Sequence, residues 1–441
     1  MTSSSAPART LEIRYAKAVR ALTAAERRAL FDRSTRGDSA VATSTATIIA
    51  AVRNRGDKAL RELALRYDGV ELASLEVPRA ARRQALDSLD RDVRRAMERS
   101  AANIASVHRA SLPRVVEMSP EPGVVIGRRP DPLGRVGVYA PGGRAAYPSS
   151  VLMGAVPARV AGVGEVILCS PPDRSGQPSA IVLAAAELAS VDLVFAIGGA
   201  GAIAAMALGT ESVPRVDKIV GPGNAYVAEA KLRLAGVVAI DVPAGPSELL
   251  IIADDAASPD VVATELLAQA EHDPLACVLA VCVGQATADL VTQSLSRLIA
   301  SMPRADVIVA SLRGQGAVLS AESVDEALAL AAEYAPEHLL LAVRDADSIV
   351  AKVRNAGTVF VGEWSSVAFG DYLTGANHVL PTGGTARAYS GLSVLDFFRW
   401  TTYQRLDRAA AGRLSIDTAI FADAEGLPGH AAAARRWSVE Q

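Results

Sequence analysis

The chain has 441 residues; half are hydrophobic, 21% are charged, only 4% are aromatic, and the formal net charge is −3 at pH 7. This composition excludes a disordered chain, and it lacks the basic excess typical of nucleic-acid-binding proteins. A chain of this length can bury extended cores, and two or three domains are expected. Three cysteines are too few for a disulfide framework and indicate a reducing compartment, the cytoplasm.

We expect no export signal at the N-terminus, because residues 1–35 contain many basic side chains and no long apolar segment. The longest apolar run, 193–209, is about as long as the shortest membrane spans, near 17 residues. Three glycines at 198, 199 and 201 divide it into an expected strand and helix. We therefore expect neither a membrane span nor a nucleic-acid partner.

In chain order, residues 1–37 are polar and arginine-rich and predict an N-terminal arm with a short helix. Residues 38–112 are predicted to be helical, with apolar spacing near 3.6 at 40–52, 59–67 and 78–108. From about Val124, strands and helices alternate, the strands at 135–139, 165–170, 193–197 and 218–220 and the helices at 149–161, 179–189, 202–208 and 225–234. This order is typical of a parallel sheet covered by helices.

Further strands are predicted at 237–241 and 248–253, followed by a helix over 259–272 whose expected N-cap is Ser258. Strands at 277–283, 307–310, 339–343 and 357–361 and a helix at 286–300 come next, and residues 392–441 form a polar, helical C-terminal arm. The fold class is α/β, with two Rossmann-like parallel-sheet domains and helical N- and C-terminal arms. We expect residues 38–138 and 248–391 to form one discontinuous domain, and residues 139–247 the other.

Two of the five histidines stand in patterns that can carry chemistry. His272 follows Gln269 by three residues near a helix end, so the imidazole and the amide share one face. They are either metal ligands or the ordinary polar end of a helix, where the helix dipole favours histidine. Glu337 and His338 follow Pro336 at a turn into a strand. The pair suits proton transfer if it is buried, or else it is a surface turn.

Other polar segments are less specific. Asp371 and His378 lie in a glycine-rich loop, 369–385, while Glu425 and His430 lie near the C-terminus in a segment that resembles a frayed tail. Glycine loops at 139–143, 198–201 and 221–224 follow predicted strands. Either their main-chain N–H groups bind phosphate, or their glycines serve only for close packing. The three cysteines, all in apolar runs, are expected to be inert buried thiols: Cys169, Cys277 and Cys282.

Taken in order, these segments resemble the histidinol dehydrogenase family from about Gly134 to His430. The resemblance rests on short motifs that follow one another along the chain: Tyr139-Ala-Pro-Gly-Gly, Tyr147-Pro-Ser-Ser-Val-Leu-Met, Gly209-Thr-Glu-Ser-Val-Pro, Gly221-Pro-Gly-Asn, Ala244-Gly-Pro-Ser-Glu, Gln269-Ala-Glu-His, Tyr334-Ala-Pro-Glu-His, Gly370-Asp-Tyr and Asn377-His-Val-Leu-Pro-Thr. Each motif is modest, and their shared order is the specific signal.

The resemblance implies oxidation of L-histidinol through the aldehyde to L-histidine, the last two steps of histidine biosynthesis, with two NAD⁺ and one Zn²⁺. It implies Glu337 and His338 as the catalytic acid/base pair. The implied zinc ligands are Gln269, His272, Asp371 and His430. The implied substrate-binding residues are Ser247, Gln269, His272, His338, Asp371, Glu425 and His430. The implied NAD contacts, on the domain 139–247, are Tyr139, Gly201 and Asn224.

The resemblance also implies a homodimer in which the C-terminal arm, with Glu425 and His430, completes the partner's site. One position departs from the family: Gly201 stands where the family usually has a glutamine that contacts NAD, so that amide is missing. Two alternatives stay open, a related zinc- and NAD-dependent enzyme for another small alcohol and a non-catalytic zinc-binding homologue.

Overall fold

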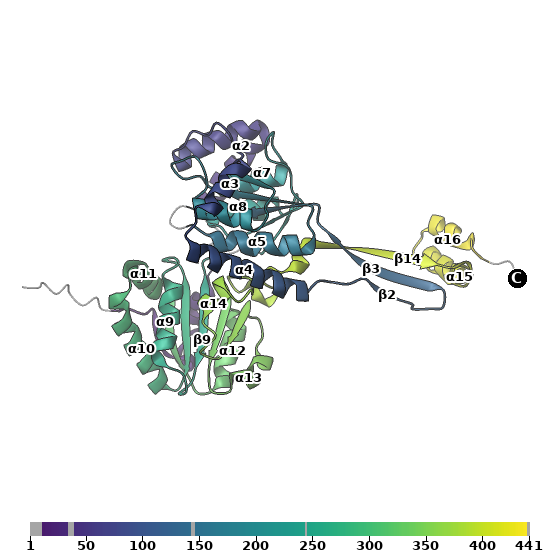
Figure 1. The fold of residues 1–441 in the computed structure, drawn as a ribbon. Coiled ribbons are helices and arrows are strands. Elements are labelled where there is room, and N and C mark those ends of the chain that lie inside the picture. The colour runs from purple at the N-terminus through teal and green to yellow at the C-terminus, as the bar shows by residue number, and fades with distance from the viewer. Residues whose placement is uncertain (1–10, 34–38, 143–145, 243–244, 439–441) are drawn as a thin grey trace, which may run out of the picture.

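The computed structural model describes residues 11–33, 39–142, 146–242 and 245–438, and it has two lobes and a projecting arm (Figure 1). One lobe is built on a six-stranded parallel sheet. In sheet order its strands are β1 (Tyr15–Ala18), β11 (Gly316–Ala321), β10 (Cys277–Val283), β9 (Glu248–Ala253), β12 (His338–Ala342) and β13 (Thr358–Val361). We refer to it as the six-stranded lobe.

Helices cover both faces of this sheet. On one face pack α9 (Pro259–Ala270), α10 (Gln285–Leu298) and α11 (Ala305–Gln315); on the other pack α1 (Ala24–Phe31), α12 (Val324–Tyr334) and α13 (Ala346–Ile349). The central strands β9 and β10 are continuous apolar runs buried on both faces, as parallel strands between two helical layers must be.

The second lobe holds a five-stranded parallel sheet in the order β6 (Leu193–Ala196), β5 (Glu165–Ser170), β4 (Arg135–Tyr139), β7 (Lys218–Val220) and β8 (Ala239–Ile240). We refer to it as the five-stranded lobe. The helices that follow its strands are α5 (Pro148–Ala161), α6 (Ala180–Leu188), α7 (Gly199–Leu208) and α8 (Ala225–Leu234). From β4 the chain adds β5 and β6 on one side, and then β7 and β8 on the other side. A topological switch point therefore lies between β4 and β7.

The helices α2 (Ser39–Leu63), α3 (Arg79–Asp87) and α4 (Arg91–Ala110) pack on the five-stranded lobe. The expected grouping of residues 38–138 with 248–391 therefore differs from the observed packing. The reason is tertiary: α2 packs on α7 and α8, α3 on α6, and α4 on α5, and the apolar side chains of these helices join one core with the sheet. Likewise β4, at the end of the 38–138 segment, is the central strand of the five-stranded sheet.

The two terminal arms contain strands as well as helices. In the N-terminal segment, β1 is the edge strand of the six-stranded sheet. In the C-terminal segment, β14 (Phe398–Leu406) pairs antiparallel with β3 (Val124–Pro132), which also pairs with β2 (Val116–Met118). This ribbon carries α15 (Arg408–Ala424) and α16 (Pro428–Arg435) away from both lobes (Figure 1). The expectation of helix throughout 392–441 was thus wrong for 398–406.

Three other local expectations have definite outcomes. The strand predicted at 307–310 lies inside α11, and the strand follows it as β11. The apolar run 193–209 divides into β6 and α7, as predicted; among the described segments, no helix combines the length and apolar character needed to cross a membrane. All three cysteines are free and buried, and burial raises the pKa of Cys277 and of Cys282 to about 12, as expected for inert thiols.

Candidate active site

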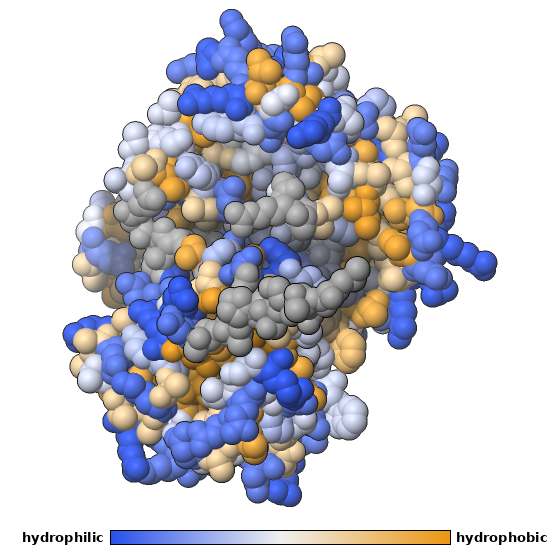
Figure 2. Space-filling model, turned by 90° about the vertical axis from the view of Figure 1, so that its left-hand side faces the viewer, coloured by the Kyte–Doolittle hydropathy of each residue, from blue (hydrophilic) through white to orange (hydrophobic). Residues whose placement is uncertain are grey.

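The candidate site lies at the amino ends of β9 and β12, near the junction of the two lobes. The junction is made by α14 (Val367–Tyr372) and the loop after it: Ser100 on α4 donates to the Tyr372 carbonyl at 2.5 Å, and Asn377 Nδ2 donates to the Met153 carbonyl on α5 at 2.8 Å. Figure 2 shows the face opposite the arm, where hydrophilic and hydrophobic residues of both lobes are interspersed.

His338 is the first residue of β12, and its side chain is 4% exposed. Its Nδ1 lies 2.8 Å from the Glu248 carbonyl oxygen, which can only accept, so Nδ1 carries a proton. Its Nε2 has no hydrogen-bond partner among the described residues and lies 3.7 Å from Asp371 Oδ1. Burial lowers the pKa of His338, but the carboxylates of Glu337 and Asp371 raise it, and the net shift is upward. Nε2 is thus the atom that faces the site.

Glu337 precedes His338 and is also buried. Its Oε2 accepts from the Glu248 main-chain N–H at 2.7 Å, and no described residue donates to its Oε1. Two residues earlier, Ala335 has a left-handed backbone with φ of 53° and ψ of 66° at the end of α12. A non-glycine residue in this conformation is uncommon, and here it turns the chain so that Glu337 and His338 enter the sheet.

Asp371 lies on α14, whose N-terminal amide at Val367 donates to Glu265 on α9 at 3.1 Å. The Asp371 main-chain oxygen lies 2.9 Å from His378 Nδ1. Burial raises the pKa of Asp371, but the neighbouring imidazoles lower it more, those of His338 first and then His378 and His272. His378 therefore belongs to the same cluster as His338.

The residues expected to bind a metal are partly brought together. Gln269 is buried in the last turn of α9, and the exposed His272 follows two residues after the helix and acts electrostatically on Asp371. Ser247, half-buried, precedes Glu248 and β9. Within the described ranges, no three His, Cys, Asp or Glu side chains gather closely enough to hold a metal ion.

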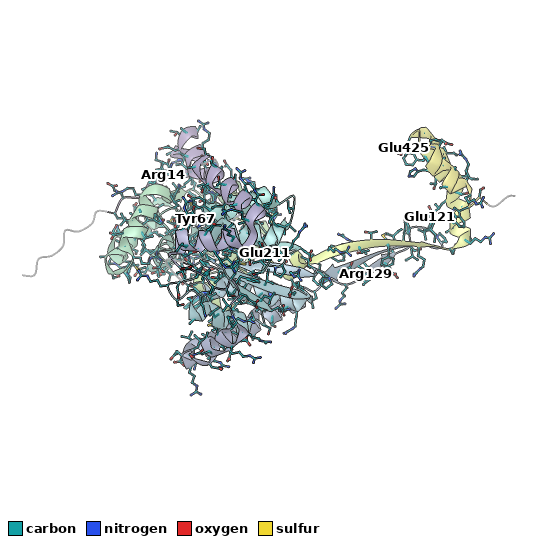
Figure 3. All side chains as sticks on the ribbon, turned by 90° about the horizontal axis from the view of Figure 1, so that it is seen from above. Arg14, Tyr67, Glu121, Arg129, Glu211 and Glu425 are labelled. Carbon is teal, nitrogen blue, oxygen red and sulfur yellow. The ribbon has the colours of Figure 1, made fainter. Side chains whose placement is uncertain are left out.

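Glu425 and His430 are the two predicted site residues that this chain does not bring to the cluster. Glu425 caps the C-terminus of α15 and His430 lies on α16, both exposed at the far end of the arm. Figure 3 shows Glu425 on the helices carried by the arm, Glu121 at the outer end of the ribbon, and Arg129 along the ribbon nearer the body of the molecule.

Two of the residues expected to contact NAD lie near the switch point of the five-stranded sheet. Tyr139 ends β4, and its buried hydroxyl accepts from the Gly199 N–H at 3.0 Å; burial raises its pKa to about 12. Asn224 caps α8, accepting from the N–H groups of Tyr226 and Val227 at 3.1 and 3.2 Å. Between them, Gly221 has φ of +116°, and a Cβ there would lie 2.1 Å from the Tyr139 carbonyl oxygen.

Gly201 is buried in the first turns of α7. A Cβ on it would lie 3.0 Å from Leu63 Cδ1 and 3.5 Å from Leu60 Cδ2, so the missing side chain would point toward α2.

Two charged residues of the cluster were not singled out from the sequence. Glu248 is 1% exposed, and its Oε2 accepts from Arg33 Nη1 at 2.6 Å, in a buried ion pair. Burial raises the pKa of Glu248 to about 7; Arg33 lowers it and Glu337 raises it. Glu248 is the first residue of the apolar run Glu248–Ala253, and a carboxylate in that position could have been predicted to be buried. The sequence around Arg33 gives no indication that Arg33 is buried.

A buried acid and an imidazole with a free Nε2, held where two parallel-sheet lobes meet, define an α/β enzyme with an acid/base site. Comparison with known proteins gives the family. The family model described as histidinol dehydrogenase matches residues 31–437. Histidinol dehydrogenase from Halobacterium salinarum is 48% identical, covering 94% of this chain and 97% of the relative. The one from Methanosarcina barkeri is 44% identical, covering 90% and 91%.

A solved structure gives the same result. The crystal structure of histidinol dehydrogenase from Elizabethkingia anophelis superposes with a TM-score of 0.92 at 32% identity, covering 97% of this chain and 98% of that chain. The chain therefore belongs to the histidinol dehydrogenase family and is an oxidoreductase.

Proposed function

We propose that this protein oxidises L-histidinol through the aldehyde to L-histidine, with NAD⁺ as the hydride acceptor and zinc in the site. The family membership supports the reaction. The observation that carries the residue roles is His338, whose Nδ1 is fixed by a main-chain carbonyl while Nε2 is left without a partner among the described residues. Oxidation of an alcohol needs a base for the hydroxyl proton as hydride leaves. Nε2 of His338 is that base once the ring has lost its proton, and the upward shift of its pKa makes the deprotonated ring a stronger acceptor.

Glu337 has the second role. The aldehyde must be hydrated before it can lose another hydride, and a carboxylate can activate that water. Because Oε2 of Glu337 is held by the Glu248 N–H, Oε1 is the oxygen that takes the water proton. His338, protonated in the first step, returns that proton to the aldehyde oxygen as water adds. The neutral ring then accepts the proton of the hydrate as the second hydride leaves to NAD⁺. No thiol takes part, in keeping with three buried cysteines of the sheets.

The donors of this chain fit zinc in part. Gln269, His272 and Asp371 offer oxygen and nitrogen atoms at one edge of the six-stranded lobe, a set suited to a zinc ion that keeps a position open for substrate. His430 of the same chain lies away from these donors, on α16 at the end of the arm, so we propose that the fourth ligand is His430 of a second copy of the chain. When bound, zinc would hold and orient the substrate. We assign further substrate contacts to Ser247 and Glu425.

The five-stranded lobe fits a dinucleotide. Ligands of such sheets bind beyond the carboxyl ends of the strands at the switch point, which here lies between Tyr139 and Gly221. At Gly221 the lack of a side chain lets the backbone lie close to Tyr139, while its N–H and carbonyl are held by Asp241 and Lys231. Asn224 begins α8 at the same edge. We assign NAD to this edge, with Tyr139 and Asn224 as contacts. Gly201 contributes no side chain to it.

We further propose that the protein is a homodimer whose arms are exchanged. The arm exposes large apolar side chains that the described part of its own chain leaves uncovered: Ile416, Ile420, Phe421 and Trp437, each at least 60% exposed. Patches of this kind mark protein–protein contacts. A second copy covering them would bring its own Glu425 and His430 to the cluster around Asp371. Free, buried cysteines support a cytoplasmic location.

The test is NADH formation from L-histidinol. We expect turnover that exhaustive chelation abolishes and added Zn²⁺ restores. His272→Ala should weaken zinc retention, since affinity depends on the full ligand set, and zinc content measured after dialysis provides a readout besides activity. Full turnover by the metal-free protein would contradict the zinc proposal, and no turnover of histidinol by the zinc-loaded protein would contradict the reaction.

A further inference from the structure

Arg33 links the two ends of the turn that presents Glu337 and His338. Its Nη2 donates to the Tyr334 carbonyl at 2.5 Å, before the turn, and its Nη1 donates to Glu248 Oε2 at 2.6 Å. That same Oε2 accepts from the Glu337 main-chain N–H at 3.3 Å, after the turn. The guanidinium also stacks on the Tyr334 ring, 3.6 Å from its centroid. The buried ion pair of Arg33 and Glu248 therefore spans the turn from Tyr334 to Glu337.

The turn between these ends is strained. Ala335 is one of three non-glycine residues with positive φ among the described ranges, and Pro336 follows it. Backbone strain of this kind persists only where the surrounding contacts over-determine it, and it clusters at functional sites. Without the Arg33 contacts, the turn could relax toward the ordinary conformations of alanine.

Glu248 reaches the catalytic pair through three of its own groups. Its carboxylate holds the Glu337 N–H, its main-chain N–H holds Glu337 Oε2, and its carbonyl accepts from His338 Nδ1. The remaining carboxylate oxygen accepts from the Gly383 N–H at 2.7 Å, which ties the loop after Pro381 to the same point. The ion pair is almost completely buried, with exposures of 2% for Arg33 and 1% for Glu248.

We propose that Arg33 and Glu248 are positioning residues that hold the strained turn at Ala335, so that Glu337 Oε1 and His338 Nε2 face the substrate. This inference rests on the proposed function, because the reaction assigns the two atoms their roles. Neither Arg33 nor Glu248 touches the reacting atoms. Their removal should therefore lower the rate of chemistry rather than the binding of histidinol.

The test compares Arg33→Met and Glu248→Gln with Arg82→Met. Arg82 is a matched control, since it is also buried, at 3% exposure, and donates to the main-chain oxygens of Val191 and Asp192 at 2.6 and 3.2 Å on the five-stranded lobe. In Arg33→Met and Glu248→Gln we expect kcat for histidinol to fall about 10–100-fold, with KM changed less than about threefold. Arg82→Met should lower thermal stability and leave kcat unchanged.

A rescue separates positioning from general damage. Glycine adopts the left-handed backbone at no steric cost, so Ala335→Gly should recover part of the kcat lost in Arg33→Met. Amide hydrogen exchange adds a readout that needs no turnover. The amides of Glu337 and Gly383 should exchange faster than in the wild type in Arg33→Met and Glu248→Gln. In Arg82→Met they should exchange at the wild-type rate.

The positioning role is overturned if folded Arg33→Met keeps kcat within twofold of the wild type, if Arg82→Met loses as much, or if Ala335→Gly recovers nothing. Failure of the proposed function has a different signature, namely a wild-type protein that forms no NADH from histidinol. The exchange rates at Glu337 and Gly383 decide the positioning role even then.

Discussion

Glu337 and His338 are neighbours in the chain, but the structure gives them separate free atoms, Oε1 and Nε2. Water enters only the aldehyde stage of the proposed reaction. Glu337→Gln should therefore slow oxidation of supplied histidinal far more than the first hydride transfer, whereas His338→Asn should slow both stages. Losses of about 10²–10⁴-fold are typical for a general base and are resolved by single-turnover measurement of NADH formation. Equal losses at both stages in Glu337→Gln would contradict the division.

Asp68, at the end of the π-helical turn Ala64–Asp68, tests burial at a single carboxyl group. Burial raises its pKa to about 6, above the value of about 3.9 for an unfolded chain. The folded protein thus binds more protons than the unfolded one between these values, so rising pH lowers stability through Asp68, and the full cost is reached above about pH 6. Asp68→Asn removes that cost.

Thermal unfolding of Asp68→Asn should therefore show a larger gain in Tm at pH 8 than at pH 5. The exposed Asp87, with 77% of its side chain accessible, supplies the control as Asp87→Asn, which should gain the same at both pH values or nothing. If Asp68→Asn raised Tm equally at both pH values, burial of the charged carboxylate would not be the reason that Asp68 destabilises the fold.

At the scale of elements, two glycines near the carboxyl edge of the five-stranded sheet differ in what they require. Gly221→Ala would force a side chain into a backbone with φ of +116°, against the Tyr139 carbonyl oxygen. We expect it to lower the free energy of unfolding by about 2–4 kcal/mol, from backbone strain and steric overlap.

Gly201→Ala is the matched case. Gly201 has an ordinary helical backbone, and its nearest neighbour is the end of the flexible, half-buried Leu63 side chain. Glycine within a helix is about 0.5–1 kcal/mol less stable than alanine, so the free energy of unfolding should change by no more than about 1 kcal/mol. Chemical denaturation of both variants checks this order, and the reverse order would contradict it.

The elements show how far sequence reasoning reaches. The strands 165–170, 218–220, 248–253 and 277–283 were predicted with their observed bounds, because buried parallel strands are short apolar runs between turn residues. The run at 307–310 has the same composition and is helical in α11, since periodicity cannot separate a short buried helix from a strand. Residues 398–406 form the strand β14 because they pair with β3. That partner lies about 270 residues away in the sequence, so the local pattern does not reveal it.

The site shows a similar division. The motifs predicted Glu337, His338 and Asp371, and the structure places these three together. The support behind them was not predictable, because Arg33 reaches Glu248 across 215 residues of sequence. The packing of α2, α3 and α4 on the five-stranded lobe was missed for the same reason: an amphipathic helix reveals that it has a buried face, but not what covers it.

For the whole molecule, the projecting arm predicts complementation between two inactive chains. His338→Asn removes the proposed base from the lobe of its own chain, and His430→Asn removes the proposed zinc ligand from the arm of its own chain. In a two-fold dimer with exchanged arms, a mixed pair has one intact site of two, and random mixing should restore about one quarter of the wild-type activity. Coexpression and an NADH assay measure it. Two copies of the same variant are the control, and no recovery on mixing would place each site within one chain.

The edge strand β1 has a consequence for how the protein is made. Tyr15 pairs with Ala317, so the strand leaves the ribosome about 300 residues before its partner β11. At translation rates of about 5–20 residues per second, it waits roughly 15–60 s. During that time the five-stranded lobe, whose strands end at Ile240, can already be complete. Arg33, which follows α1, likewise waits for Glu248. The turn that presents Glu337 and His338 is therefore among the last parts of the nascent chain to be secured, and a release of the chain before β11 would leave a folded five-stranded lobe without that turn.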